Sequence, residues 1–348
     1  MAVMAVQSVR RMRGGAQSQL MLGADSKLWV VKFQNNPQHL RVLANEMIAT
    51  RIAAALGLTV PKCDVVEVSE WLVQNSPDMQ MELGRQRRER CAAGLQFGCE
   101  FVGGLMPGQV VDYLPDPQME EVRNLAEFAG MLAVDKWTGN CNGRQAVFER
   151  RARERKYRAI FIDQGFCFNA GEWTFPDAPL RGVFARNLVY RGVRGWDAFE
   201  PWLELIENFS AAKLGEIAES VPPAWYGGDP REIERLMETL LARRSRVREL
   251  IGQFRDSNRE PFPKWGKMES VVVPRAFEEG ASAAKFVVLR PAMGRSWMVA
   301  APMADALVVI GPTVIKSGFP SPFTSTRTGC DPVLAFVSGL RNVGVACV

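Results

Sequence analysis

The sequence predicts an α+β protein with a small β-rich N-terminal lobe, a mainly helical second lobe and an ill-defined C-terminal segment. Residues 5–34 consist of short apolar runs separated by glycine-containing turns, which is typical of strands. After about residue 100, apolar side chains recur mostly every three or four positions, which is typical of helices. The C-terminal residues are apolar and rich in Ser, Thr, Gly and Pro, and they fit neither pattern. We therefore divide the 348 residues into 1–95, 96–264 and 265–348.

Each element of the first lobe has a recognisable sequence signal. Gly14-Gly15 separates "VQSVRRMR" from "LML" and marks a turn with unusual backbone angles. The following strand, "LWVVKFQ", carries Lys32. Asn36-Pro37 then predicts a helix N-terminus, and apolar residues continue at helical spacing from there. "CDVVEVS" and "GLQFGCEFVGG" complete the predicted small sheet.

The second lobe begins with a predicted helix over "MEEVRNLAEFAGMLAVDKW". A polar loop, "TGNCNGRQAVFER" (138–150), separates this helix from a clear strand, "YRAIFID". Three more helices follow, and Asp229-Pro230 marks the start of the last one. Because loops placed on a rigid scaffold often hold catalytic groups, this loop is the first place to search for chemistry.

Composition excludes several classes of function. His39 is the only histidine, and we expect it at the surface, so a Ser-His-Asp triad or a multi-histidine zinc site is not expected. The seven cysteines form no CxxC pair, and we expect reduced thiols in a cytoplasmic protein. No signal peptide or membrane span is expected. A net charge of +5 does not by itself indicate nucleic-acid binding, although basic residues cluster at 85–90 and 150–158.

Four sequence features together predict a nucleotide site because of their order along the chain. Alone, a Gly-Gly turn is usually a hairpin, a strand lysine or a helix glutamate usually lies at the surface, and an Asp-x-Gly is often only a turn. ATP phosphates, however, need a glycine-rich cover, a lysine held by a carboxylate, and a carboxylate that binds magnesium. Gly14-Gly15, Lys32, Glu46 and Asp163 supply these parts in that order.

Two longer stretches resemble a known family. "MRGGAQSQLML…LWVVKFQNNPQ…LANEMIATRIAAALGLTVP" resembles the start of HipA-like kinases, and "FAGMLAVDKWTGN…YRAIFIDQGFCF" resembles their catalytic core. The resemblance covers roughly residues 8–264. It implies a two-lobed atypical kinase fold, related to phosphatidylinositol kinases, with ATP and magnesium as cofactors and Ser/Thr phosphorylation as the commonest activity. By the same resemblance, Lys32 contacts phosphates, Glu46 orients Lys32 and Asp163 binds magnesium.

The loop departs from the family pattern. Asn140 is kept, but Asn142 stands at the position of the catalytic aspartate and Val147 at that of the second metal ligand. An amide cannot accept a proton at neutral pH, and valine cannot bind magnesium. We expect Arg144 to neutralise charge on a transferring phosphoryl group and Gln145 to orient a water or hydroxyl.

Three functions stay open at this point. The first is ATP-dependent phosphoryl transfer to an unknown protein or small-molecule acceptor. The second is a nucleotide-binding regulator or scaffold without significant turnover, and the third is an interaction protein that binds no nucleotide. Asp135 is expected to hold the loop by hydrogen bonds rather than to act as a displaced base. Arg181 and Arg186 are interpreted mainly as solvated side chains, with binding of an acidic or phosphorylated partner as the alternative.

Overall fold

A computed structural model describes residues 2–84, 87–103 and 106–266, together with four short strands beyond them. The chain divides into two compact units. The first contains the residues up to Val193 and Ala198–Pro263, and the second contains Arg194–Asp197 and the residues from Lys264 onward. In the second unit, β11 (Val287–Leu289) pairs antiparallel with β12 (Met298–Ala300), and β13 (Leu307–Ile310) with β14 (Thr313–Lys316). Apart from Trp265 and Gly266, the other residues expected in the C-terminal segment lie outside the described part.

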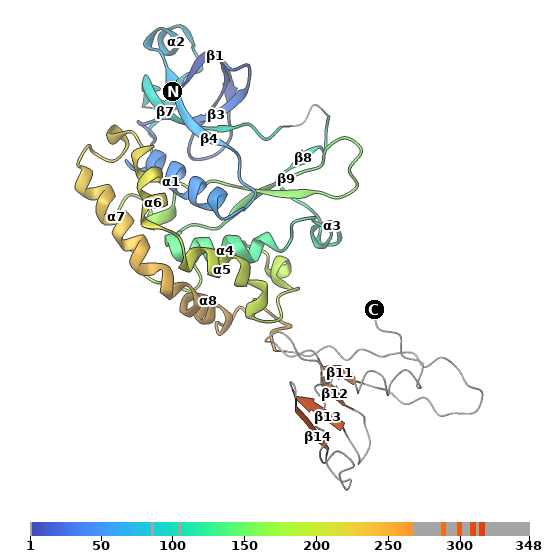
Figure 1. Ribbon diagram of the computed structural model, residues 1–348. Helices are drawn as coiled ribbons and strands as arrows, with labels where there is room; N and C mark the ends of the chain where they lie inside the picture. The colour runs from blue at the N-terminus through green and yellow to red at the C-terminus, as the bar shows by residue number, and fades with distance from the viewer. Residues whose placement is uncertain are drawn as a thin grey trace. The chain divides into compact units, whose positions relative to one another are not determined.

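The β-rich lobe is a closed five-stranded barrel in the order β1-β2-β3-β7-β4 (Figure 1). Its strands are β1 (Val3–Arg11), β2 (Gln19–Gly23), β3 (Leu28–Lys32), β4 (Cys63–Val68) and β7 (Gly94–Glu100). All pairs are antiparallel except that of β1 with β4. The barrel closes over buried side chains such as Met21, Val31 and Phe33. A short helix, α2 (Glu70–Asn75), and a hairpin of β5 (Gln80–Glu82) and β6 (Arg88–Arg90) complete this lobe.

The helix after β3 is α1 (Val42–Ala55), and it begins five residues later than the sequence predicts. Asn36 does not cap it, because the Asn36 carboxamide accepts from the Gln38 backbone N–H and donates to the Ala16 carbonyl, 2.9 Å away in both cases. The predicted helix start is therefore wrong. Asn36 instead links the glycine turn to the residues before α1 through its hydrogen bond to Ala16. An N-cap motif in the sequence does not reveal this contact.

The second lobe is mainly helical, as predicted, and its central helix is α4 (Glu127–Thr138). Every α4 residue from Phe128 to Thr138 is buried, and the Trp137 indole donates to the Leu240 carbonyl. The single helix expected over residues 119–137 is wrong, because α3 (Asp116–Glu120) is separated from α4 by turns. The other helices are α5 (Glu200–Glu207), α6 (Ala211–Glu219), α7 (Pro230–Arg243) and α8 (Val247–Arg255). Asp229 caps α7, as predicted.

A three-stranded sheet contains the first two strands after the loop that follows α4. It consists of β8 (Val110–Val111), β9 (Gln145–Glu149) and β10 (Arg158–Ile162) in the order β10-β9-β8 (Figure 1). Short 3-10 turns occupy Cys167–Asn169, Asn187–Tyr190, Trp196–Ala198, Pro223–Trp225 and Arg244–Arg246. Because β9 and β10 are adjacent and antiparallel, the end of the loop and the end of β10 meet at one edge of this sheet.

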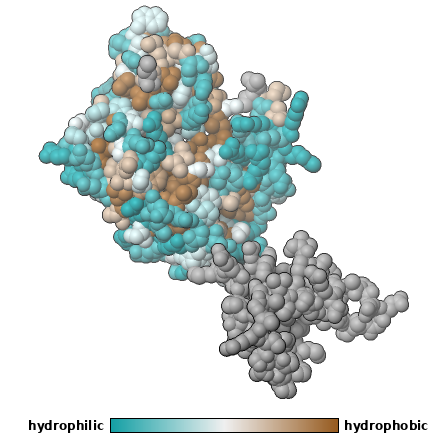
Figure 2. Space-filling model, in the orientation of Figure 1, coloured by the Kyte–Doolittle hydropathy of each residue, from teal (hydrophilic) through white to brown (hydrophobic). Residues whose placement is uncertain are grey.

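On the face drawn in Figure 2, hydrophilic residues predominate and apolar residues form patches between them. None of the helices in the described residues has the length and apolar character needed to cross a bilayer.

Candidate functional site

Three of the predicted residues meet although they are far apart in the sequence. The Lys32 ammonium forms an ion pair with the Glu46 carboxylate, and it also lies 2.8 Å from Asp163 Oδ1. Lys32 is the last residue of β3, Glu46 lies in the first half of α1, and Asp163 directly follows β10. Lys32 is 8% exposed and Glu46 is 3% exposed. The lysine is therefore a fixed cation between two carboxylates.

Burial and charge act against each other on these groups. Burial alone would lower the pKa of Lys32, but the carboxylates of Glu46 and Asp163 outweigh it and raise that pKa above its usual value. Burial raises the pKa of Glu46, although Lys32 acts in the opposite direction. Burial would also raise the pKa of Asp163, but Lys32 outweighs it and holds that pKa below its usual range. Lys32 and Asp163 are therefore charged at neutral pH.

Helix α1 also holds the backbone that follows Asp163. Glu46 accepts hydrogen bonds from the backbone N–H groups of Gln164 (3.0 Å) and Gly165 (2.8 Å). Asp163 itself has a left-handed backbone conformation, with φ of 62°. A non-glycine residue persists in this conformation only where its surroundings hold it there. Glu46 thus orients Lys32 and fixes the segment after Asp163 at the same time.

Asn45, which the sequence analysis did not single out, also holds the backbone segment that follows Asp163. Its carboxamide donates to the carbonyls of Gly165 (2.9 Å), Cys167 (2.9 Å) and Ala170 (2.8 Å), and it accepts from the Trp173 indole (2.8 Å). Asn45 is fully buried. Its sequence signal is its position beside Glu46 in the helix segment "VLANEMIA", where the other side chains are apolar.

His39 is not a surface residue, so the expectation from sequence is wrong. It is half-buried, and Nε2 lies 2.8 Å from the Gly165 carbonyl, so this nitrogen carries the proton that is donated. Burial lowers the pKa of His39, and the Gly165 hydrogen bond acts in the opposite direction. Its ring packs edge-on against Phe166. His39 therefore adds a third contact between the start of α1 and the segment after Asp163.

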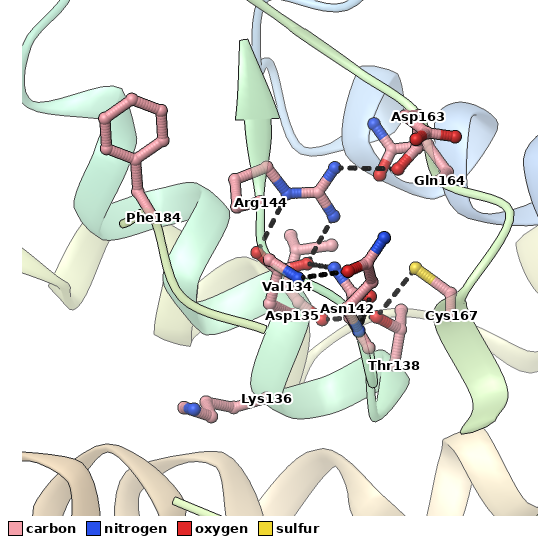
Figure 3. A network of polar contacts seen from close by, with 12 residues as sticks. Val134, Asp135, Lys136, Thr138, Asn142, Arg144, Asp163, Gln164, Cys167 and Phe184 are labelled. Atoms are coloured by element: carbon pink, nitrogen blue, oxygen red, sulfur yellow. Dashed lines mark hydrogen bonds and ion pairs between the residues drawn. The ribbon is translucent and has the colours of Figure 1, made fainter. Parts of the chain in front are cut away.

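The predicted loop is built on a buried ion pair between Asp135 and Arg144 (Figure 3). The Arg144 guanidinium donates to both Asp135 carboxylate oxygens and to the Ile162 carbonyl, 3.0 Å away. Asn140 donates to Asp135 at 2.9 Å and accepts from the Asn142 backbone N–H at 3.0 Å. Only 1% of each side chain in the ion pair is exposed. Asp135 thus holds the loop, as expected, and Arg144 is occupied inside the fold.

The exposed side of the loop carries fewer polar contacts. Asn142 is exposed, and its side-chain oxygen accepts from the Gly143 backbone N–H. Gln145 is not in the loop but begins β9, and its Nε2 donates to Asp163 Oδ2 at 2.7 Å. Val147 lies further along β9, opposite Ile160. Asn142 therefore supplies no carboxylate to the loop, and Val147 supplies no oxygen ligand.

The glycine turn lies between β1 and β2, as predicted. Gly14 has φ of 117°, a conformation that side chains with a Cβ rarely adopt. A Cβ on Gly15 would lie 3.4 Å from Gln38 Nε2. Together with the Asn36 contact to Ala16, this places the turn against the residues that precede α1.

Hydrogen bonds also connect the segment around Pro179–Arg181 to the helical lobe. The buried Lys136 ammonium donates to the carbonyls of Pro179 (2.8 Å) and Arg181 (2.6 Å). Burial lowers the pKa of Lys136 to about 8. Arg186 forms an ion pair with Asp116, so it is not simply solvated. The exposed Arg181 guanidinium donates to Asn169 at 3.2 Å.

We predict that Asn45→Ala loosens the segment after Asp163 without unfolding the lobes. The carbonyls of Cys167 and Ala170 lose the Asn45 donor, whereas Gly165 keeps the His39 donor, and a buried group left unsatisfied costs about 1–3 kcal/mol. Amide hydrogen exchange of residues 164–173 should become at least about tenfold faster, because tenfold corresponds to about 1.4 kcal/mol. Mass-spectrometric exchange measures this.

Asn124 supplies a matched control, because its carboxamide also binds backbone groups but at Ala159 in β10. Asn124→Ala should change exchange near Ala159 and leave residues 164–173 as they are. If amide hydrogen exchange of residues 164–173 were unchanged in Asn45→Ala, Asn45 would not be the residue that holds this segment in place.

Residues 5–104 match the HipA-like kinase family. The chain is also similar to solved structures of the Helicobacter pylori proinflammatory kinase CtkA (12% identity, 68% of this chain and 94% of that chain, TM-score 0.41) and of a Golgi casein kinase with Mn/ADP bound (11% identity, 72% and 73%, TM-score 0.42). A third is HipA of Shewanella oneidensis MR-1, in a complex with HipB and operator DNA (14% identity, 73% and 69%, TM-score 0.38).

No curated protein matches this sequence. The family match includes β3 with Lys32 and α1 with Glu46, whereas Asp163 and the loop after α4 lie beyond the matched residues. The family match over residues 5–104 agrees with the resemblance to HipA-like kinases that the sequence shows.

Proposed function

We propose that this protein binds ATP with magnesium between its β-rich and helical lobes and transfers a phosphoryl group slowly to a Ser/Thr-type acceptor. The observation that carries the proposal is the buried Lys32–Glu46 pair with Asp163 beside it. Lys32 is a cation whose position is fixed before any ligand arrives. Such a group can neutralise phosphate oxygens without paying the cost of being ordered on binding.

The residues present fit a magnesium ion. Asp163 is an ionised oxygen ligand at the end of a strand, and the exposed Gln145 amide lies beside it. Magnesium in phosphoryl-transfer sites is usually held by one or two carboxylates and by substrate phosphates, with waters completing the shell. When bound, the ion would neutralise charge on the β- and γ-phosphates. Asp163 would hold the ion, and Lys32 would contact the phosphates.

The loop supports positioning rather than proton abstraction. Asn142 has no basic group, and Asp135 of α4, the carboxylate that holds the loop, is already bound by Arg144 and Asn140. We expected Arg144 to neutralise transferring charge, but a buried guanidinium that binds Asp135 and the Ile162 carbonyl is better placed to hold the loop. Phosphoryl transfer depends chiefly on positioning and electrostatics, so loss of a base slows it without abolishing it.

The proposal is tested by calorimetry with ATP, in magnesium and in EDTA, followed by mass spectrometry of the protein after incubation. We expect binding that magnesium strengthens, loss of that strengthening in Asp163→Asn, and slow autophosphorylation. Absence of ATP binding to the unmodified protein would contradict the proposed function. Transfer of AMP instead of phosphate would show that the reaction type is wrong.

The alternative function is a nucleotide-binding regulator without significant turnover. Asn142 and Val147, which replace an acid and a metal-binding amide of the family pattern, favour it. Asn142→Asp separates the two readings, because the side chain is exposed and the substitution preserves its shape. A weakened kinase should autophosphorylate faster with the aspartate, whereas a dedicated regulator should show no transfer with either residue.

A further inference from the structure

The pairing of β9 with β10 decides which side chain lies beside Asp163. Gln145 is opposite Ile162, the residue directly before Asp163, and its Nε2 lies 2.7 Å from Asp163 Oδ2. The register therefore brings an amide, not an apolar side chain, to the carboxylate that the proposed function assigns to magnesium. Gln145 is exposed, so its amide is accessible from the site.

Val147, the residue at the family's second ligand position, lies elsewhere on the same strand. It pairs with Ile160, two residues from Gln145, and two strand residues correspond to about 6.6 Å along the chain. Side chains two residues apart project from the same face of a strand. The intervening Ala146 and the following Phe148 are both buried. Gln145 and Val147 therefore share the accessible face, and Gln145 is the one that reaches Asp163.

We propose that Gln145 is the second magnesium ligand of this protein and supplies the oxygen that Val147 cannot supply. This inference rests on the proposed function. A glutamine carboxamide carries an NH₂ donor and a carbonyl acceptor at one end, and its terminal torsion is broad. Without metal, the NH₂ group donates to Asp163. Rotation of the amide by about 180° would present its carbonyl oxygen on the same side, where it would be available to a cation.

The chemistry of this pair suits magnesium and similar hard divalent cations. Carboxylate and amide oxygens are hard ligands, and magnesium prefers them to nitrogen or sulfur. Asp163 supplies one negative charge and Gln145 a neutral dipole, so phosphate oxygens and water complete the shell. Lys32 donates to Asp163 Oδ1, so Oδ2, the oxygen beside Gln145, is the one that would be available to a metal ion.

The experiment compares the affinity for a non-hydrolysable ATP analogue in magnesium and in EDTA, by calorimetry. Gln145→Ala should lower the magnesium-dependent gain in affinity about tenfold, as expected when a group that tunes a metal site is removed. Its affinity in EDTA should stay unchanged, because Lys32 and Glu46 are intact. Gln145→Glu should increase the magnesium-dependent gain, because a charged oxygen replaces a neutral one.

Val147→Ala is the matched control, since it alters the same strand face without touching Asp163. Its magnesium-dependent gain in affinity should equal that of the unmodified protein.

A second measurement uses Mn²⁺ and electron paramagnetic resonance, where Gln145→Ala should weaken Mn²⁺ binding to the nucleotide complex by a similar factor. If Asp163→Asn loses the magnesium gain while Gln145→Ala keeps it, Gln145 is not a ligand and the proposed function still stands. If the unmodified protein binds no ATP, the proposed function and this inference both fail.

Discussion

Replacing Lys32 by methionine is expected to weaken ATP binding tenfold or more. Methionine keeps the apolar stem within β3 but removes the ammonium that lies between Glu46 and Asp163. A charge-assisted contact of this kind contributes about 1.5–3 kcal/mol, which corresponds to a tenfold or larger change in affinity. Calorimetry with the magnesium complex of ATP measures the change.

The same substitution should also reveal the cost of burying Glu46. Glu46 is 3% exposed, and burial already raises its pKa. Without Lys32 that pKa should rise further, so folding takes up a proton. A carboxyl group with a raised folded-state pKa stabilises the fold at low pH and loses that contribution as pH rises. As the pH rises above the ordinary carboxyl range, the melting temperature of Lys32→Met should therefore fall more than that of the unmodified protein.

Lys27 provides the matched control, because it directly precedes β3 and forms an ion pair with Glu100, but at the surface. Lys27→Met should leave ATP affinity and the pH dependence of melting nearly unchanged. The double variant Lys32→Met, Glu46→Gln should remove the pH dependence while keeping the loss of affinity. If Lys32→Met bound ATP normally, the nucleotide would not contact this lysine.

The second large effect is expected from Asp135→Ala. This change leaves the Arg144 guanidinium buried without its anion and removes the acceptor of Asn140. Breaking a buried ion pair by removing one partner costs about 3–5 kcal/mol. For a folded unit of this size, the melting temperature should fall by on the order of 10 °C. Differential scanning calorimetry measures the shift.

Glu120→Ala serves as the control, because the Glu120–Arg191 pair is exposed and surface pairs contribute only about 0–1 kcal/mol. A double-mutant cycle with Asp135→Asn and Arg144→Met then isolates the coupling between the two buried groups. A fall of less than about 2 °C in Asp135→Ala would mean that the pair does not hold the loop.

Local sequence patterns were sufficient for most of the fold. Apolar alternation and Gly-Gly placed the barrel strands, helical spacing placed α1, and Asp229-Pro230 placed the start of α7. These patterns work because each depends on residues a few positions apart. The helix start at Asn36 failed for the complementary reason: the partners of Asn36 include Ala16, twenty residues earlier, and no local pattern records that contact.

The sequence by itself predicts Lys32, Glu46 and Asp163 as candidates for a phosphate and metal site, because they are the right chemical groups in the right order. Only the tertiary structure decided what the neighbouring side chains do. It buried Arg144 against Asp135, placed Asn45 over three carbonyls and brought Gln145, rather than Val147, to Asp163. The directions of these side chains depend on strand register and on partners that lie 9 residues away for Arg144, 18 for Gln145 and at least 120 for Asn45. Neither leaves a period or a spacing in the sequence that could be read in advance.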